Sequence, residues 1–174
     1  PQCQGHKKEE WIQKREQDIL PCSYYHVVFT LPEELNGLAI SQPQLIYKAL
    51  FEAAWATLNQ FGKTEGLQLG MIAILHTWGQ NLSLHPHLHC IVPGGGLTMQ
   101  GKWRKKVRTD KFLFPVKALS KVFRAKFVTS LRACGITDRD LMEKLFTKNW
   151  VVYAKRPFGG PKQVIEYLGR YTHK

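Results

Sequence analysis

Histidines at alternating positions are the residues of this chain whose types and spacing most directly suggest chemistry. His87 and His89 are separated by one residue, and four of the seven histidines fall within fourteen residues. Alternate side chains of a β-strand share a face, so these two imidazoles would project together, roughly 7 Å apart along the strand. Neutral imidazoles are frequent ligands of divalent metals. The pattern therefore predicts a metal centre on a strand.

A third histidine is brought to this pair by the hairpin that the flanking sequence predicts. Two apolar segments, Leu67–Thr77 and Leu82–Val92, enclose Trp78–Asn81, where glycine and asparagine favour a turn. A turn there makes the numbers of paired residues sum to about 163 to 165, which sets His76 opposite the stretch that holds His87. His76 is therefore the expected third ligand.

The choice of metal depends on what completes this ligand set. The softness of imidazole alone favours Mn, Zn, Co or Ni over Mg. Water and phosphate oxygens in the remaining positions would make Mg or Mn workable. The expected cofactor is a divalent metal, Mg or Mn first and Zn, Co or Ni next. The alternative is a cluster of histidines without a metal. The expected ligands are His76, His87 and His89, with His85, Gln80 and His26 as alternatives.

Two tyrosines near the end of the chain form the second candidate group. Gln163, Tyr167 and Tyr171 recur every four residues, so on a helix they lie on one face, with the two phenols about 6 Å apart along the axis. A phenol with an ordinary pKa near 10 is a poor nucleophile at neutral pH. A nearby metal or a cation such as Arg170 or Lys174 would make attack on a phosphate feasible. The alternative is a tyrosine stripe that only packs against a sheet.

The charge of the chain favours a polyanionic partner. Lys and Arg number 25 against 13 acidic residues, a net charge of +12. Between Gly101 and Arg132, eleven Lys and Arg face one acid, Asp110. Nucleic acid is the commonest partner of such a surface, a basic face without a specific partner is the alternative, and an anionic membrane fits less well. The candidate DNA contacts are Lys102, Arg104, Lys105, Lys106, Arg108 and Arg170.

The elements that must position these residues follow from periodicity and from turn residues. Strands and helices alternate along the chain, and Gly94–Gly96 is expected to break the second strand of the hairpin. The order is strand, helix, hairpin, helices, strand, helix, which predicts an α+β fold with a mostly antiparallel central sheet and helices packed on it. The expected elements outside the hairpin are a helix over Lys7–Leu20, a strand over Tyr24–Leu31, a helix opened by a capping box at Ser41–Gln44 and ended near Gly62, helices over Val116–Leu131 and Asp138–Phe146, a strand over Trp150–Tyr153, and a last helix from Pro161.

Length and cysteine usage bound the class of protein. The 174 residues suit one domain, with room for a short appendage, and no apolar run approaches the roughly 18 residues of a membrane span. The four cysteines (Cys3, Cys22, Cys90 and Cys134) lie far apart and form no CxxC pair. A reducing compartment and a soluble, cytoplasmic protein are therefore expected.

At this point the residues resemble a known family. His87-Leu-His89 is similar to the His-hydrophobic-His signature of HUH single-strand endonucleases, and Tyr167-Leu-Gly-Arg-Tyr171 to the paired tyrosines of their two-tyrosine branch. The longer strings resemble the transposases of rolling-circle insertion sequences in four separated places. These strings are Tyr25–Pro32, His76–Gln80, His85–Gly96 and Tyr167–His173.

The resemblance implies a fold, a mechanism and a partner. The sheet would be related to the RRM and ferredoxin-like arrangement, with the metal on its central strands. The metal at His87, His89 and a third ligand would polarise the scissile phosphate of single-stranded DNA at transposon ends and targets. One of Tyr167 and Tyr171 would attack, giving a 5′-phosphotyrosine, and the other would hold or exchange a second strand. A bacterial, nucleoid-associated location follows from such a partner.

Two departures from the family pattern bear on domain organisation. Members usually begin with a cysteine-rich zinc module, of which Cys3, His6 and Cys22 would be an echo, with too few ligands for a closed tetrahedral site. They also continue past the tyrosine helix. The expected division is therefore a remnant of the zinc module and a linker helix in residues 1–22, followed by a C-terminally truncated tyrosine nuclease domain in residues 23–174.

Three other functions compete with the transposase. A plasmid replication initiator or conjugative relaxase would use the same chemistry. A non-catalytic single-stranded DNA-binding relic would have a decayed site, whereas His87, His89, Tyr167 and Tyr171 are all present. A metal-dependent hydrolase in which the tyrosines merely pack would need a general base near the metal, and no Asp or Glu lies between Glu65 and Asp110. The hydrolase is therefore the least favoured of the three.

Overall fold

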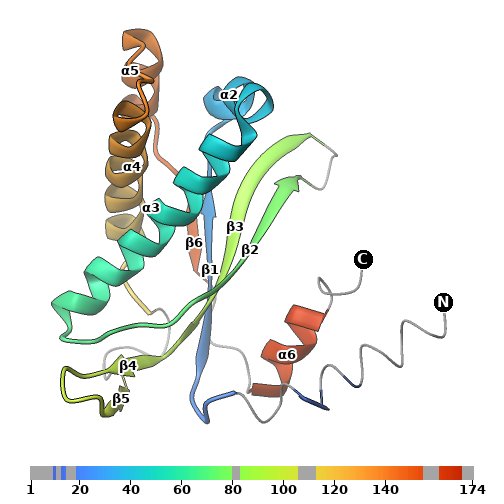
Figure 1. Cartoon of the computed structure of the whole chain (residues 1–174), viewed down its shortest axis with the longest axis vertical. Helices are drawn as coiled ribbons and strands as arrows, with labels where there is room; N and C mark the ends of the chain where they lie inside the picture. Colours follow the sequence, from blue (N-terminus) through green and yellow to red (C-terminus); the bar gives the residue numbers. More distant parts are fainter. Residues whose placement is uncertain are drawn as a thin grey trace.

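The structure is a computed structural model that describes residues 10, 13, 14, 19–79, 83–105, 113–154 and 161–169. Figure 1 shows a long sheet with two long helices on one side and a short helix on the other. The strands are β1 (Tyr24–Thr30), β2 (Ile72–Trp78), β3 (Leu84–Pro93), β4 (Gly95–Leu97), β5 (Trp103–Lys105) and β6 (Val152–Ala154). The helices are η1 (Glu33–Leu35), α2 (Asn36–Ser41), α3 (Pro43–Thr64), α4 (Val116–Ala133), α5 (Arg139–Thr147) and α6 (Pro161–Gly169).

The main sheet has four strands in the order β2-β3-β1-β6, and all its pairs are antiparallel. Helix α3 connects β1 to β2, and α4 lies between β3 and β6. Two β-α-β units interleaved in this way are the ferredoxin-like arrangement. The predicted α+β class with a mostly antiparallel sheet is confirmed.

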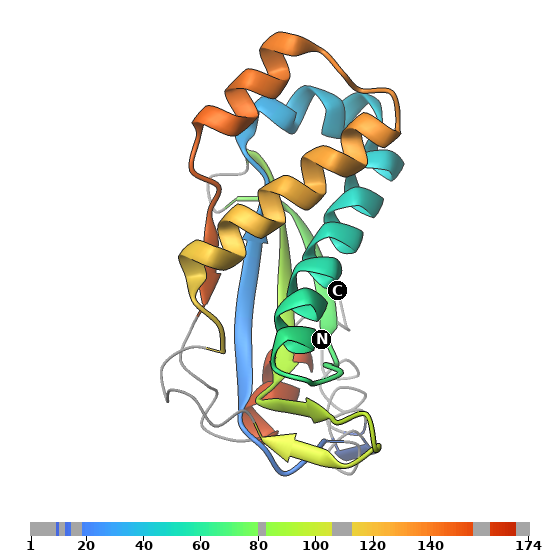
Figure 2. The same ribbon diagram turned by 90° about the vertical axis from the view of Figure 1, so that its left-hand side faces the viewer.

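Both long helices cover the same face of the sheet, as Figure 2 shows with α3 and α4 crossing in front of the strands. Val27 and Phe29 of β1 face this side, and both are fully buried. Phe29 meets Phe123 of α4 with ring centroids 4.8 Å apart, and Phe127 follows one turn further along α4. This face holds the larger of two apolar clusters, so it forms the main core.

Helix α3 begins at Pro43, as its position in a first turn predicts. The predicted capping box is wrong. Ser41 is the last residue of α2, and its hydroxyl donates to the carbonyl of Gly37 at 3.0 Å. The N-cap of α3 is Gln42, with no side-chain cap hydrogen bond. The physical reason is that α2 runs into α3 with one residue between them, so Ser41 satisfies its own helix.

The predicted hairpin is confirmed in β2 and β3, with two differences at its outer ends. The first strand begins at Ile72 rather than Leu67, because residues 67–71 pass under α3 and contribute only one bridge, between Gln68 and Leu97. The predicted break of the second strand is confirmed at Gly94, a bend that follows the end of β3 at Pro93, but Gly95 and Gly96 belong to a new strand, β4, in a separate sheet. A Cβ there would lie 2.5 Å from a backbone oxygen of a neighbouring segment, so the glycines permit close backbone contact.

The second face of the sheet is covered in part by α6. Tyr24 of β1, Ile91 of β3 and Val164 of α6 are buried together there, with Ile74 and Tyr167 packed against them. The predicted helix from Pro161 is confirmed through Gly169. The helix predicted over Lys7–Leu20 falls mostly outside the described residues. Among the helices that are described, none combines the length and the apolar character that crossing a membrane requires.

Candidate functional site

The register between β2 and β3 brings the predicted histidines together. His76 pairs directly with His87, as the sum of their numbers predicted, and His89 lies two residues further along β3. All three side chains share the face opposite α3 and α4, because Leu88 and Cys90 between them point into the main core. The face that lacks the long helices is therefore the face that carries the imidazoles.

The three rings are close enough to converge on one ion. The centroid of the His76 ring lies 5.2 Å from that of His87 and 4.3 Å from that of His89, and the latter two centroids are 4.9 Å apart. One nitrogen of each ring lies within 4.8 Å of the other two. All three side chains are partly buried, which limits their rotation.

Contacts at Nδ1 orient two of these rings, those of His87 and His89. Nδ1 of His87 lies 2.6 Å from the carbonyl oxygen of His85, so this nitrogen carries a hydrogen and donates it. Nδ1 of His89 contacts Nε2 of His26 at 2.7 Å. Metal-binding histidines commonly use one nitrogen for the ion and the other for such a partner. Partial burial lowers the pKa of His87, against the opposing effect of its bond to the His85 carbonyl, and this favours the neutral, ligand form.

This donor set fits a divalent metal. Metal–nitrogen bonds of about 2.1 Å allow two ligand nitrogens to stand up to about 4.2 Å apart, so the 4.8 Å grouping closes with small ring movements. Three neutral nitrogens on rigid strands leave further positions to water or substrate oxygens. The alternative ligand His85 is exposed and lies at the strand entrance, and Gln80 lies outside the described residues.

Tyr167 reaches this centre from α6. Its hydroxyl lies 2.8 Å from Nδ1 of His89 and 3.2 Å from Nε2 of His26. The side chain is half-buried and packs against the apolar cluster of Tyr24, Ile91 and Val164. A phenol therefore stands directly against a candidate metal ligand. Tyr171 and Arg170 lie outside the described residues.

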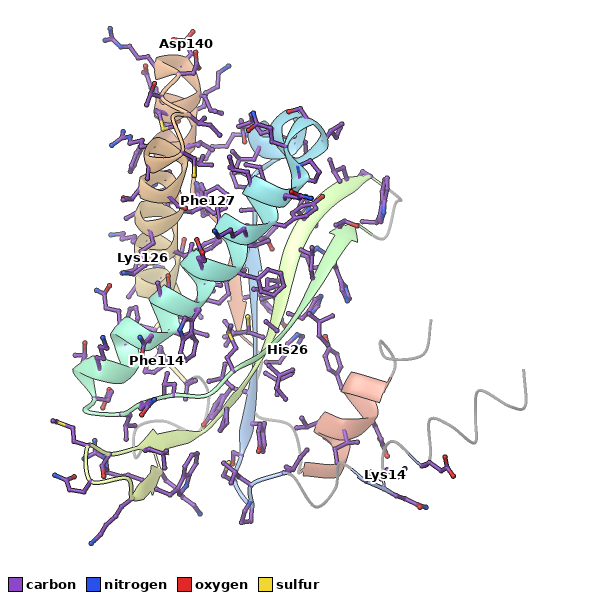
Figure 3. The ribbon with its side chains drawn as sticks, viewed as in Figure 1. Lys14, His26, Phe114, Lys126, Phe127 and Asp140 are labelled. Carbon is purple, nitrogen blue, oxygen red and sulfur yellow. The ribbon has the colours of Figure 1, made fainter. Side chains whose placement is uncertain are left out.

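His26 is the functional candidate that sequence reasoning underrated, since it entered only as an alternative ligand. It lies near the middle of the sheet on the side of α6, where Figure 3 labels it, and it is 6% exposed. One signal for its role was available. His26 interrupts the apolar run of β1 at a position that shares a face with Tyr24 and Val28.

The predicted DNA contacts that the structure describes lie on or beside β5. Lys102, Arg104 and Lys105 are exposed, whereas Lys106 and Arg108 lie outside the described residues. Gly95, the first residue of β4, follows His89 by six positions, so the β4–β5 hairpin begins about 20 Å along the sheet from the histidines. The guanidinium of Arg104 donates to the backbone carbonyls of Glu65 and Gly66 at the end of α3. Arg104 therefore also has a structural role.

Of the residues assigned to the zinc-module remnant, few lie in the part of the chain that the structure describes. Cys3 and His6 lie outside the described residues, and Cys22 is a partly buried free thiol. Burial raises the pKa of the Cys22 thiol, although hydrogen bonds to the Gly94 backbone and Tyr24 oppose the shift. The assignment of residues 1–22 to a remnant of the zinc module therefore stays a prediction.

Comparison with protein families gives two matches. A family model described as "Putative transposase" matches residues 70–174, and one described as "Transposase zinc-binding domain" matches residues 1–31. Two relatives match the chain over its whole length. It is 40% identical to "Putative transposase y4qJ" of Sinorhizobium fredii and 29% identical to the transposase for insertion sequence element IS801 of Pseudomonas savastanoi pv. phaseolicola. The chain spans 48% and 45% of the length of these two relatives.

Comparison with solved structures finds the conjugative relaxase TrwC in complex with oriT DNA. A copper-bound structure has a TM-score of 0.47 at 19% identity, covering 66% of this chain and 45% of that chain. A metal-bound structure has a TM-score of 0.48 at 16% identity, covering 70% and 52% respectively.

Proposed function

The chain belongs to the transposase family whose model matches residues 70–174, and on this premise we propose that its histidine centre and Tyr167 cut and rejoin single-stranded DNA during rolling-circle transposition. One observation carries the proposal. The Tyr167 hydroxyl lies 2.8 Å from Nδ1 of His89, so the candidate nucleophile stands beside the candidate metal ligands. Both matched relatives are transposases, which favours transposition over plasmid replication or conjugation.

The reaction is a phosphodiester transesterification. The phenolic oxygen of Tyr167 bonds to phosphorus as the phenol loses its proton, and the bond from phosphorus to the 3′ oxygen breaks. The departing oxygen takes up a proton and becomes a 3′-hydroxyl, while the 5′ end stays on the tyrosine. Attack by a 3′-hydroxyl on this phosphotyrosine reverses the step. No energy source is needed, since one phosphodiester replaces another.

His76, His87 and His89 would hold the metal for this step, with Mg or Mn as the proposed ion. When bound, the ion supplies a Lewis acid that polarises a non-bridging oxygen of the scissile phosphate. The side chains contribute a fixed position, since all three are anchored on paired strands. The packing of Tyr167 against the apolar cluster of Tyr24, Ile91 and Val164 would hold the nucleophile at the same place.

Tyr171 would carry the second strand. It follows Tyr167 by four residues, so continuation of the helix would set both phenols on one face. A second nucleophile allows one DNA end to remain covalently bound while another is cut, as strand transfer requires. Arg170 would supply a cation for the phosphates.

The proposed partner is single-stranded DNA at insertion-sequence ends and targets. Exposed Lys102 and Lys105 extend the binding surface away from the histidines, and one of the matched relatives is named for an insertion sequence. The proposed domains are a zinc-module remnant with its linker in residues 1–22 and the nuclease domain in residues 23–174. Action on bacterial DNA would place the protein at the nucleoid.

The test is formation of a covalent adduct. The chain is incubated with end-labelled single strands that carry the ends of IS801, with Mn²⁺ or Mg²⁺, and the products are separated on a denaturing gel. A slowly migrating DNA–protein adduct is expected. It should disappear in Tyr167→Phe and in His87→Ala, and it should persist in Tyr153→Phe, a tyrosine of β6 that is 52% exposed. Cleavage that leaves no adduct, or an adduct that survives in Tyr167→Phe/Tyr171→Phe, would contradict the mechanism.

A further inference from the structure

His26 connects the candidate metal ligand to the candidate nucleophile. Its Nε2 lies 2.7 Å from Nδ1 of His89 and 3.2 Å from the hydroxyl of Tyr167. The rings of His26 and His89 stack, with centroids 4.9 Å apart and planes 15° from parallel. Sequence separations of 63 and 141 residues divide His26 from these partners, so only the tertiary structure makes the contact.

From these contacts we propose that His26 is a positioning residue, which fixes His89 in its metal-binding orientation and holds the Tyr167 hydroxyl against it. This proposal rests on the proposed function, in which His89 is a metal ligand and Tyr167 is the nucleophile. Each ligand on β3 would then have its own backing group. His87 uses the backbone carbonyl of His85, and His89 uses the side chain of His26.

Geometry distinguishes this role from that of a fourth ligand. His26 contacts Nδ1 of His89, which leaves Nε2 of that ring for an ion. The cluster of ligand atoms within 4.8 Å of one another contains His76, His87 and His89, and His26 is not among them. His26 Nε2 accepts the hydrogen of His89 Nδ1 when the His26 hydrogen is on Nδ1, and this is the tautomer that the proposal requires.

The position of His26 also suits a group that must not move. It lies on β1, which is paired on both sides, with β3 and β6. Its direct partner on β3 is Ile91, so it reaches His89 diagonally across the ladder. At 6% exposure it is a buried polar side chain on the strand face that it shares with Tyr24. An apolar residue would pack there at little cost in stability, so an effect on metal binding would reveal the polar contact itself.

The experiment compares two substitutions of His26, one that keeps a hydrogen-bond acceptor near Nε2 and one that does not. His26→Gln places an amide oxygen near the position of Nε2 and can still accept from His89, whereas His26→Phe keeps a ring and removes the acceptor. Tyr24→Phe is the matched control, since Tyr24 lies on the same strand and face and is also 6% exposed. Mn²⁺ affinity is measured by calorimetry without DNA, adduct formation under single-turnover conditions with saturating Mn²⁺, and folding by thermal denaturation.

Mn²⁺ binding by His26→Phe is expected to weaken about 10–100-fold, the usual effect of removing a partner of a metal-binding histidine. His26→Gln should recover most of this loss, and Tyr24→Phe should bind as the wild type does. Adduct formation should slow in His26→Phe even at saturating Mn²⁺, because Tyr167 loses a contact, while the melting temperature changes little.

Three results would overturn the positioning role. Wild-type Mn²⁺ affinity in His26→Phe would show that the contact has no effect on the ligand. Equal losses in the Gln and Phe variants would show that a hydrogen-bond acceptor at this position does not restore Mn²⁺ binding. Abolition of Mn²⁺ binding in both variants, as in His87→Ala, would make His26 a ligand. The Mn²⁺ affinities can be compared even if the wild type forms no adduct. Failure of this proposal can therefore be distinguished from failure of the proposed function.

Discussion

Four imidazoles on three neighbouring strands differ in role because their nitrogens face different neighbours. His76 contributes from β2 and is paired with His87, whose Nδ1 is held by a backbone carbonyl. His89 is backed by His26, a side chain on the other neighbouring strand. The two candidate ligands on β3 would therefore respond differently to mutation of their surroundings, since Nδ1 of His87 contacts a backbone carbonyl and Nδ1 of His89 contacts a side chain.

His76 and His85 form a matched pair for testing the ligand set. His76→Ala is expected to weaken Mn²⁺ binding by at least about 100-fold, since even the loss of a ligand's partner costs about 10–100-fold. His85→Ala should change affinity by less than about threefold, because His87 is held by the backbone carbonyl of residue 85, which alanine retains. Calorimetry with Mn²⁺ measures both. Equal effects of the two substitutions would instead make His85 a ligand.

At the scale of elements, the end of α3 is fitted closely to the segment that leads into β2. Gly62 is buried there, and a Cβ at this position would lie 2.6 Å from Cγ of Leu69 and 2.9 Å from the carbonyl oxygen of Leu67. The helix end predicted near Gly62 is confirmed, since α3 ends at Thr64, but the positive φ of 66° belongs to Gly66. Gly62 is therefore required for packing and not for a turn.

This close packing predicts opposite effects for two Gly→Ala substitutions. Gly62→Ala should lower the free energy of unfolding by about 1–3 kcal/mol, because overpacking outweighs the helix propensity that alanine gains. Gly37→Ala in α2 should raise it by about 0.5 kcal/mol, since nothing lies within 4 Å of the added Cβ. Urea denaturation followed by circular dichroism measures both. A stabilising Gly62→Ala would mean that Leu69 moves aside freely.

At the scale of the whole molecule, the connectivity separates the core from the site. The two long connections place α3 and α4 on one face, which leaves the other face for the histidines and α6. After His89, the chain continues along β3 and then forms the β4–β5 hairpin. The exposed Lys102 and Lys105 of this hairpin lie at the far end of the sheet from the histidines. A DNA strand bound at both places would extend beyond the phosphate that is cut.

Salt dependence of DNA binding tests this extended contact. For single strands the slope of log affinity against log salt is about 0.7 per neutralised phosphate, so Lys102→Ala/Lys105→Ala should reduce the slope by about 1.4. Lys48→Ala is the control, since Lys48 pairs with Glu52 at 3.9 Å on the exposed side of α3. Fluorescence anisotropy with a labelled single strand between about 50 and 200 mM salt supplies the slopes. An unchanged slope in the double variant would remove the hairpin from the DNA surface.

Local pattern in the sequence was sufficient for the fold class and for the histidine grouping. The alternation at His87 and His89 and the turn near Gly79 fix side-chain faces and strand register, and register alone sets His76 opposite His87. Proline at position 43 marked where α3 begins. These features depend on neighbours within a few residues or across one short turn, and so the order of residues determines them.

Only the tertiary structure decided which other groups stand beside the histidines. His26 meets His89 and Tyr167 because β1 pairs with β3 and because α6 docks on the face that α3 and α4 leave open. Gly96 of β4 likewise lies against a backbone segment that is distant in sequence, since a Cβ there would lie 2.5 Å from the carbonyl oxygen of Gln68. Contacts of this kind depend on how sheet and helices pack together, and no periodicity along the chain encodes that packing.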